Sequence, residues 1–558
     1  MTKKAFARWR GYVFLSALVL FFAFNANVPP MGLDESMYMT ASREMAASGD
    51  LLTPAYNGDP FFDKPPMTYW LQCASSAFFD VFFQEQRLWD ARGALPADGR
   101  LFGMRAVSGV AGLLLLWLVM ACGKTFFSPR AAVYAGFAFA LSLLTCALGK
   151  MAITDMLLGL WCSASLFLFL LTYTRRLKKK YIVAAFASLG LALLTKGPIA
   201  AGIVGLPVLC FLAYRRDLRF MFDRYTAAGL LLMLAVAAPW YLLMQRAHGG
   251  FFYEFFMHQN LQRALGQDFA HNYNPFIYVG VILLGMAPWS LFLAPALIKY
   301  CRAKKTMLCE GFLSLWVISL FVMFTFINSR LPGYIFPVFP AAALLVGKYL
   351  EEYRPGRGAK AALVCSFALS VLLGGAVAAA PWFLEHQGLL VRCLAGLAGL
   401  WFAVFGAIAL ARRGGHPAPA LVCQSLGFLL LLVCILPALG LDPDTLKDEL
   451  DTKSDFLGTT GYIISRDFRP DDMPRDTAVI SYGLHPLQVN FPFFAERKVY
   501  MPRTREELLA LTEKEKYYFL VTDVKTQKRE GLDSLPGRAV KDKRYAGSRN
   551  GLYIKIKN

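Results

Sequence analysis

Charged residues are scarce in this chain of 558 residues: Asp, Glu, Lys and Arg make up 17% of it, while 56% is hydrophobic. About a quarter of the residues of an ordinary soluble domain are charged. The shortage is concentrated in long apolar runs, most of them near the length that a helix needs to cross a bilayer. The composition therefore excludes a soluble protein and predicts one that crosses the membrane many times.

Metal-binding cysteine motifs and soluble phosphate-binding motifs are also missing. The 11 cysteines form no CxxC pair, and most lie within apolar runs, where they act as small buried hydrophobic residues. None follows Cys434, so residues 441–558 are not a disulfide scaffold. The chain has no GxxxxGK[ST] loop and no GxGxxG after a strand. We therefore expect no nucleotide cofactor.

The net charge of +20 does not indicate nucleic acid. Basic and acidic residues are nearly balanced after Leu441, and the basic excess lies in short loops between apolar runs. Basic residues in such loops mark the cytoplasmic side of a membrane protein. The charge therefore reports orientation, and no nucleic-acid partner is expected.

Thirteen apolar runs are the candidate membrane spans. They lie near residues 11–28, 104–122, 131–149, 152–173, 181–195, 198–214, 225–243, 276–299, 309–327, 333–350, 360–382, 389–411 and 418–439. If the N-terminus is cytoplasmic, the strongly basic loops, such as 175–180 and 215–224, all fall inside. An odd number of spans then places the C-terminal residues 441–558 outside.

The fold class expected is an all-α polytopic membrane protein with a small outer α/β domain. Residues 1–440 form the membrane domain, whose outer loops 29–103 and 244–275 contain short helices lying along the membrane surface. Residues 441–558 alternate strand-like runs with one helical segment, which is typical of a small α/β domain.

Polar residues from distant parts of the chain fall at the outer ends of apolar runs. They are Asp34, Glu35, Asp63, Lys64, Asp155, Lys196, His258, His271, Arg330 and Tyr334. Singly, each has a structural explanation, such as capping a helix or reaching toward lipid headgroups. The adjacent pairs Asp34–Glu35 and Asp63–Lys64 favour function, because paired charges beside a span are costly to place without use.

This set suits transfer chemistry on phosphorylated lipids. Lys64, Lys196 and Arg330 can bind phosphate oxygens, and Tyr334 can donate a hydrogen bond. A carboxylate with a histidine can hold a divalent cation or orient a nucleophile.

Five stretches carry a resemblance to a known family: the acidic pair after the first run, SREMAASGD, FFDKPPMTYW, LLTKGP and NSRLPGYIFPVFP. They resemble the GT-C membrane glycosyltransferases of the protein O-mannosyltransferase superfamily, and most of all the bacterial lipid A aminoarabinose transferases (ArnT-type). The resemblance implies transfer of a sugar, 4-amino-4-deoxy-L-arabinose, from undecaprenyl phosphate to a phosphate of lipid A. It also implies a place in the bacterial inner membrane with the active site on the periplasmic face.

The resemblance also assigns roles to residues. It matches Asp34 and Asp155 to acidic positions of the catalytic site, and Glu35 is a further catalytic candidate beside Asp34. It matches Lys64 and Tyr334 to the groups that bind the donor phosphate, and Lys196, Arg330 and Tyr38 are further candidates for this binding. Asp63 and His258 are the implied ligands of a divalent metal, Zn or Mg/Mn. The chain departs from the family pattern at two positions, with Met37 in place of an arginine and Asp63 in place of a glutamate.

Other functions stay open at this point. The acceptor could be a hydroxyl of a protein or glycan, in which case Asp34 is the general base, and the sugar could differ. A transporter of lipid-linked sugars would also need basic phosphate-binding groups, although the chain has no paired repeat of broken helices. An outer-face binding protein of an envelope complex is a third reading. A monomer is expected.

Overall fold

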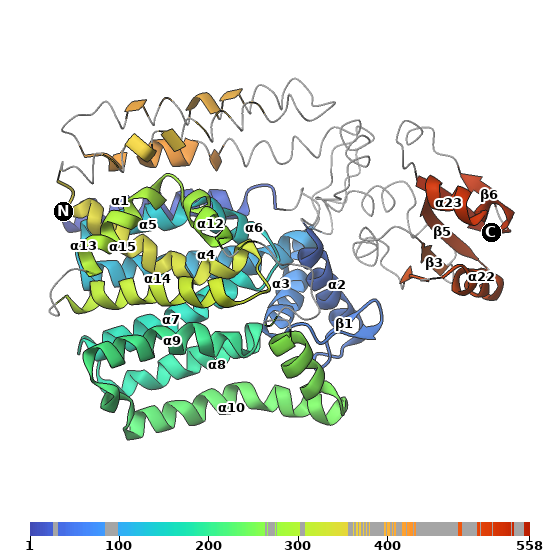
Figure 1. Cartoon of the computed structure of the whole chain (residues 1–558), viewed down its shortest axis with the longest axis horizontal. Helices are drawn as coiled ribbons and strands as arrows, with labels where there is room; N and C mark the ends of the chain where they lie inside the picture. The colour runs from blue at the N-terminus through green and yellow to red at the C-terminus, as the bar shows by residue number, and fades with distance from the viewer. Residues whose placement is uncertain are drawn as a thin grey trace.

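The structure is a computed structural model that describes most of the membrane region and parts of the C-terminal domain. In the membrane region it describes residues 1–25, 32–83, 99–262, 276–301 and 307–354, with isolated positions elsewhere between 265 and 430. Near the C-terminus it describes 478–482, 499–502, 504–515, 517–536, 538–540 and 552–557. The helices lie side by side as a bundle, and the C-terminal sheet lies beyond the end opposite the N-terminus (Figure 1).

Six described helices are long and apolar enough to cross a membrane. They are α1 (Lys3–Phe22), α4 (Gly99–Phe126), α7 (Asp155–Tyr173), α10 (Arg224–Ala247), α14 (Leu308–Phe326) and the continuous segment Pro332–Glu351, made of η6 (Pro332–Val338) and α15 (Phe339–Glu351). The number rises to eight within the described residues if each of two bent pairs counts as one span. The chain is therefore a multi-pass membrane protein.

Two of the predicted spans are each broken into two helical parts by a bend. The span 131–149 is α5 (Pro129–Ala140) followed by α6 (Leu143–Lys150), with a bend of 61° between them. The span 276–299 is α12 (Ile277–Gly285) followed by η5 (Trp289–Phe292) and α13 (Leu293–Cys301), with a bend of 109°. Pro288 lies at the second break, where its ring and missing N–H do not allow α12 to continue.

The two shortest predicted spans are separate helices, α8 (Ile182–Lys196) and α9 (Ile199–Arg215). Gly197 stands between them with φ of +79°, a conformation that side chains rarely adopt. A Cβ at this position would also lie 2.9 Å from the Phe255 ring. The chain therefore turns here because glycine alone fits. The last three predicted spans, 360–382, 389–411 and 418–439, lie largely outside the described residues.

The first outer loop contains α2 (Gly32–Ser48), a hairpin of β1 (Ala55–Tyr56) and β2 (Asp59–Pro60), and α3 (Met67–Phe83). The second outer loop contains η4 (Tyr253–Gln262), a π-helix. Thr53 Oγ1 lies 3.0 Å from His248 Nε2, and the rings of Phe62 and Phe251 lie 5.4 Å apart, so the two loops pack together.

The C-terminal region contains a five-stranded mixed sheet with the order β4-β3-β5-β7-β6. Its elements are β3 (Ala478–Ser481), β4 (Val499–Tyr500), α22 (Arg505–Lys514), β5 (Tyr518–Asp523), α23 (Val524–Glu530), η9 (Leu532–Ser534), β6 (Arg538–Val540) and β7 (Leu552–Lys557). The predicted strands at 478–482, 517–522 and 552–556 coincide with β3, β5 and β7. The strands β4 and β6 and the helix α23 were not predicted.

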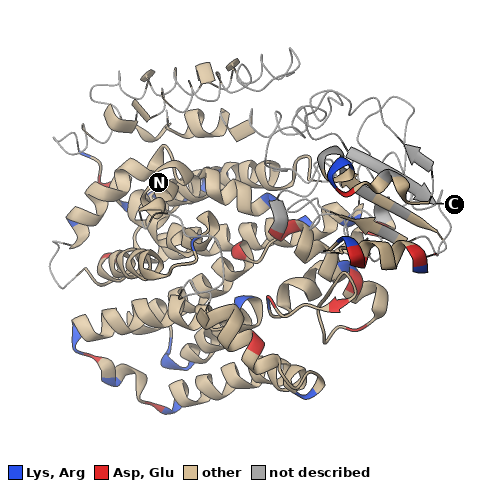
Figure 2. Ribbon diagram, turned by 45° about the vertical axis from the view of Figure 1, so that its right-hand side comes forward, with Lys and Arg blue, Asp and Glu red and all other residues tan. Residues whose placement is uncertain are grey.

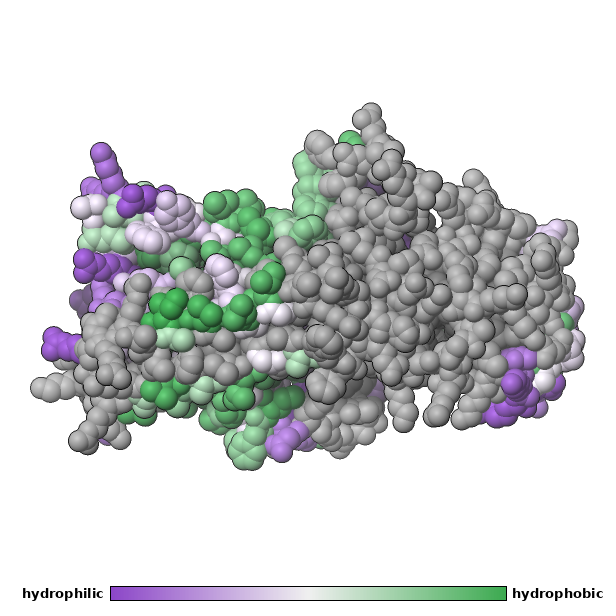
Figure 3. All heavy atoms as spheres, turned by 90° about the horizontal axis from the view of Figure 1, so that it is seen from above, coloured by the Kyte–Doolittle hydropathy of each residue, from purple (hydrophilic) through white to green (hydrophobic). Residues whose placement is uncertain are grey.

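Charge and exposure follow the expectation for a membrane bundle. Lys and Arg gather at the end of the bundle opposite the sheet domain, whereas most of the acidic residues lie toward the other end (Figure 2). Seen from above, hydrophilic residues cover that basic end and hydrophobic residues lie next to them (Figure 3). On α10, Leu231 is 68% exposed and Leu242 is 61% exposed, as expected of side chains that face lipid.

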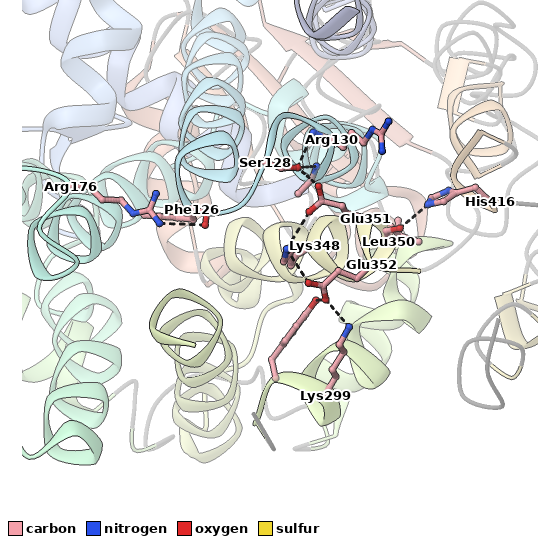
Figure 4. Close-up of polar contacts among 12 residues, drawn as sticks. Phe126, Ser128, Arg130, Arg176, Lys299, Lys348, Leu350, Glu351, Glu352 and His416 are labelled. Atoms are coloured by element: carbon pink, nitrogen blue, oxygen red, sulfur yellow. Dashed lines mark hydrogen bonds and ion pairs between the residues drawn. The ribbon is translucent and has the colours of Figure 1, made fainter. Parts of the chain in front are cut away.

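Ion pairs at the basic end tie three helices together (Figure 4). Lys348 of α15 lies 3.3 Å from Glu351 and 3.0 Å from Glu352, and Lys299 of α13 reaches Glu352 at 2.6 Å. Ser128, the N-cap of α5, donates to Glu351. This end of the bundle is therefore held by a compact charge network, far along the helices from the outer loops.

Gly347→Ala is expected to destabilise the contact between α5 and α15. A Cβ at Gly347 would lie 2.6 Å from the Ala131 carbonyl oxygen and from the Ala135 nitrogen, both of which are backbone atoms. Overpacking of this kind costs about 1–3 kcal/mol. Thermal unfolding of the purified variant should therefore begin at a lower temperature. Gly311→Ala is the matched control, because an added Cβ there meets nothing within 4 Å; equal melting of both variants would contradict the packing.

Candidate active site

The first half of the site is the turn that joins the hairpin to α3. Lys64 Nζ lies 2.6 Å from Asp63 Oδ2, and the Tyr38 hydroxyl of α2 donates to the same oxygen at 3.1 Å. Pro65 and Pro66 follow and restrict the backbone just before α3 begins. Burial raises the pKa of Tyr38 well above its ordinary value, so its hydroxyl stays a donor. The turn thus holds one lysine at a defined place beside the bundle.

The second half of the site comes from three helical segments. Asp155 is the first residue of α7, Lys196 is the last residue of α8, and Tyr334 lies in η6. Lys196 Nζ is 2.8 Å from Asp155 Oδ1 and 4.3 Å from the centre of the Tyr334 ring. At Gly333 an added Cβ would lie 3.3 Å from Asp155 Oδ1, so η6 approaches the ion pair closely.

Both halves line one pocket. Its polar lining residues are Asp63, Lys64, Lys196, Gln259, Asn260, Ser329 and Tyr334. Its apolar lining residues are Leu158, Ile199, Ile203, Phe324 and Ile327. Two lysines in one pocket with aliphatic and aromatic side chains form a site for an anion that carries an apolar chain. The predicted convergence of Lys64, Lys196 and Tyr334 is therefore found in the structure.

Three lining residues were not predicted from the sequence. The Ser329 hydroxyl is buried and has no hydrogen-bond partner among the described residues. A buried donor without a partner is rare and fits a site that is completed by a ligand. Gln259 and Asn260 also line the pocket, next to the predicted His258. The signals available for them were the position of Gln259 and Asn260 beside His258 and the place of Ser329 within the NSRLPGYIFPVFP stretch.

Asp34 lies at the start of α2, with its side chain open to solvent. Even so, the surrounding protein removes enough water to raise the pKa of its carboxyl above its ordinary value. Asp63 and Asp155 also raise this pKa, whereas Lys64 and Lys196 lower it. Asp34 is therefore electrostatically coupled to both ion pairs of the pocket.

Glu35, a predicted catalytic residue, lies in a buried ion pair with Arg105. Its carboxylate is fully buried and accepts two hydrogen bonds from Arg105, one from Nε at 2.8 Å and one from Nη2 at 3.0 Å. The Ala152 backbone N–H donates to it at 2.8 Å, and Arg105 in turn donates to the Asn25 carbonyl at 2.9 Å. Glu35 thus joins α2 to α4, to the end of α1 and to the link between α6 and α7.

Arg330 and His258 lie beside the pocket without lining it. Arg330 is buried, and its Nη2 donates to the Thr325 carbonyl at 3.1 Å. His258 Nδ1 is 2.7 Å from Glu254 within η4. The predicted phosphate contact of Arg330 is therefore not part of the pocket lining. His271 lies outside the described residues.

The residues implied as metal ligands do not fit a preformed metal centre. Asp63 Oδ2 already accepts from Lys64 and Tyr38, and His258 Nδ1 is paired with Glu254. Over the described ranges, no three His, Cys, Asp or Glu side chains lie together in a group that could hold a metal ion. We therefore derive no step of the reaction through a metal.

Known proteins are similar to this chain in sequence and in structure. Residues 94–242 match the family of dolichyl-phosphate-mannose-protein mannosyltransferases. An undecaprenyl phosphate-alpha-4-amino-4-deoxy-L-arabinose arabinosyl transferase of Edwardsiella ictaluri is 27% identical over 451 residues, which is 77% of each chain. The crystal structure of ArnT from Cupriavidus metallidurans bound to undecaprenyl phosphate superposes with a TM-score of 0.75 at 21% identity, covering 99% of this chain and 98% of that one.

The chain has the ArnT fold. The oligosaccharyltransferase of Archaeoglobus fulgidus is a more distant structural relative, with a TM-score of 0.51 and 15% identity over 94% of this chain and 70% of that chain. The resemblance to the ArnT-type transferases of the protein O-mannosyltransferase superfamily, first seen in the sequence motifs, is confirmed.

Glu35→Ala is expected to unfold or strongly destabilise the protein, because it leaves the Arg105 guanidinium buried without its partner. Breaking a buried ion pair in this way costs about 3–5 kcal/mol. Asp34→Asn is the neighbouring control and should melt like the wild type, since Asp34 is exposed. The measurement is thermal unfolding in detergent. A well-folded Glu35→Ala protein without activity would restore the catalytic role of Glu35.

Proposed function

We propose that this protein transfers 4-amino-4-deoxy-L-arabinose from undecaprenyl phosphate to a phosphate of lipid A. The observation that carries the proposal is the pocket in which Lys64 and Lys196 lie beside an apolar wall, since it suits a phosphate on a polyprenyl chain. The names of the relatives and the undecaprenyl phosphate bound to the structural neighbour support the same donor.

In this reaction the bond between the anomeric carbon of the sugar and the carrier phosphate oxygen breaks. The electron pair stays on the phosphate, and an acceptor oxygen forms the new bond to the anomeric carbon. Lys64 and Lys196 stabilise the negative charge that develops on the departing phosphate, with the hydroxyls of Tyr334 and Ser329 as further donors. Each lysine carries three N–H donors, so it can bind phosphate while it stays paired with its carboxylate.

Asp34 acts on the other side of the transferred sugar. An acceptor phosphate is already anionic and needs no strong general base, so an ionised Asp34 would orient the acceptor or stabilise positive charge on the sugar. Asp155 acts through Lys196, which it holds in place at 2.8 Å. Asp155 is therefore a positioning residue in this scheme.

We infer a location in the bacterial inner membrane, with the site on the periplasmic face. The inferred topology has thirteen spans and a cytoplasmic N-terminus. Residues 1–440 form the catalytic membrane domain and residues 441–558 an outer α/β domain. The basic residues gathered at the end of the bundle opposite the sheet support this orientation. The protein is proposed to act as a monomer.

Lys64→Ala and Asp34→Asn should abolish transfer while leaving the protein folded. Lys64 contacts the departing phosphate directly, and removing one such charge typically lowers the rate by about a hundredfold or more. The assay mixes purified protein with undecaprenyl phosphate-aminoarabinose and lipid A and measures the mass of the modified lipid A. Met67→Leu near the same turn is a packing control and should keep activity. Full activity of the Lys64→Ala variant would contradict the proposed donor-phosphate site.

Transfer should also fall at acidic pH, with a midpoint above the ordinary carboxyl pKa of about 3.9. Asp34 must be ionised to act, and a raised pKa means that it takes up a proton at a higher pH than usual. Activity is therefore complete above that raised pKa and is lost as the pH falls through it. A pH–rate profile that shows no acidic limb in the wild type would contradict the role of Asp34.

Removing divalent metal is expected to leave transfer intact, since Asp63 already pairs with Lys64 and Tyr38, and His258 pairs with Glu254. The resemblance implies the opposite, with Zn or Mg/Mn at Asp63 and His258. Dialysis against EDTA followed by the transfer assay separates the two. Loss of turnover that is restored by added Zn²⁺ or Mn²⁺ would favour the metal site.

A further inference from the structure

The first outer loop contacts the C-terminal domain through Asn57. Asn57 Nδ2 donates to the Val499 carbonyl oxygen at 2.6 Å, and the Val499 N–H donates to Asn57 Oδ1 at 2.7 Å. These residues are 442 positions apart in the chain. A side-chain amide has the same donor and acceptor as a peptide group, so Asn57 pairs with Val499 as a neighbouring strand would.

Val499 belongs to β4, the outermost strand on its side of the described sheet. The other side of β4 is paired with β3 in parallel register, Val479 with Val499 and Ile480 with Tyr500. An edge strand presents backbone N–H and C=O groups that can form hydrogen bonds with another segment. Asn57 forms hydrogen bonds with both the N–H and the C=O of Val499, so the contact is made to the backbone of β4.

The turn that carries Asn57 is itself held from the opposite side. Asn57 and Gly58 have φ values of +57° and +81°, as a two-residue hairpin turn requires. Their backbone N–H groups donate to the two carboxylate oxygens of Glu44 in α2, at 2.8 and 2.9 Å. Glu44 thus fixes the turn independently of Val499, and the turn offers the Asn57 side chain outward to the C-terminal domain.

We propose that Asn57 is a positioning residue that docks the C-terminal domain at the outer side of the active site, where the domain contributes to acceptor binding. Within the described residues, the donor pocket is lined by the membrane domain, and Lys64 is held there by Asp63. What Asn57 positions is therefore the domain, and the acceptor is the substrate that depends on it. This inference rests on the proposed transferase function.

The test compares Asn57→Gly and Asn57→Asp with the wild type. Glycine accepts the positive φ without strain and removes both hydrogen bonds, whereas aspartate tolerates this φ and keeps only the acceptor for the Val499 N–H. Asp59→Asn in the same hairpin is the control, since Asp59 is exposed on β2.

Hydrogen exchange in the full-length protein reports the docking directly. In Asn57→Gly the Val499 amide should exchange roughly fivefold to tenfold faster, as expected for one lost hydrogen bond, with a smaller effect in Asn57→Asp. Asp59→Asn should exchange like the wild type. Unchanged exchange at Val499 in Asn57→Gly would overturn the docking, whatever the activity of the protein.

Steady-state kinetics then report what the docking does. The KM for lipid A should rise severalfold in Asn57→Gly, while the KM for undecaprenyl phosphate-aminoarabinose stays within about twofold. A rise in the donor KM of Asn57→Gly would overturn the assignment to the acceptor side. Faster exchange at Val499 with an unchanged KM for lipid A would also overturn it. A wild-type protein without transfer would contradict the proposed function and leave the exchange result to decide the docking.

Discussion

The buried ion pair between Glu35 and Arg105 decides where the active site lies. A carboxylate and a guanidinium removed from water must satisfy each other with good geometry, and these two do so through two hydrogen bonds. Further bonds to Ala152 and Asn25 tie the pair to the link before α7 and to the end of α1. The start of α2, and with it Asp34, is fixed against the bundle by this network.

The same constraint explains the two lysines of the pocket. Lys64 and Lys196 are mostly buried near an apolar wall, and each is held by one carboxylate, Asp63 and Asp155 respectively. The pairing holds both lysines in place before any anion arrives. A phosphate then meets a preorganised pair of cations, which is the arrangement that stabilises charge developing in a transition state.

Much of this architecture could be predicted from the sequence, because membrane spans and loop charges follow strong physical rules. The helices α1, α4, α7, α8, α9, α10, α14 and α15 lie where apolar runs predict them, and sorting polar residues by side of the membrane brought Lys64, Lys196 and Tyr334 together. The role of Glu35 could not be predicted, since its partner lies 70 residues away in an apolar helix. Bends, the buried hydroxyl of Ser329 and the contact of Asn57 with Val499 depend on tertiary packing that no local pattern reports.

The most direct test is an experimental structure of the protein with undecaprenyl phosphate bound. We expect the phosphate within hydrogen-bond distance of both Lys64 and Lys196, with the prenyl chain along Ile199, Ile203 and Phe324. A phosphate bound elsewhere, with both lysines contacting only Asp63 and Asp155, would contradict the proposed donor site.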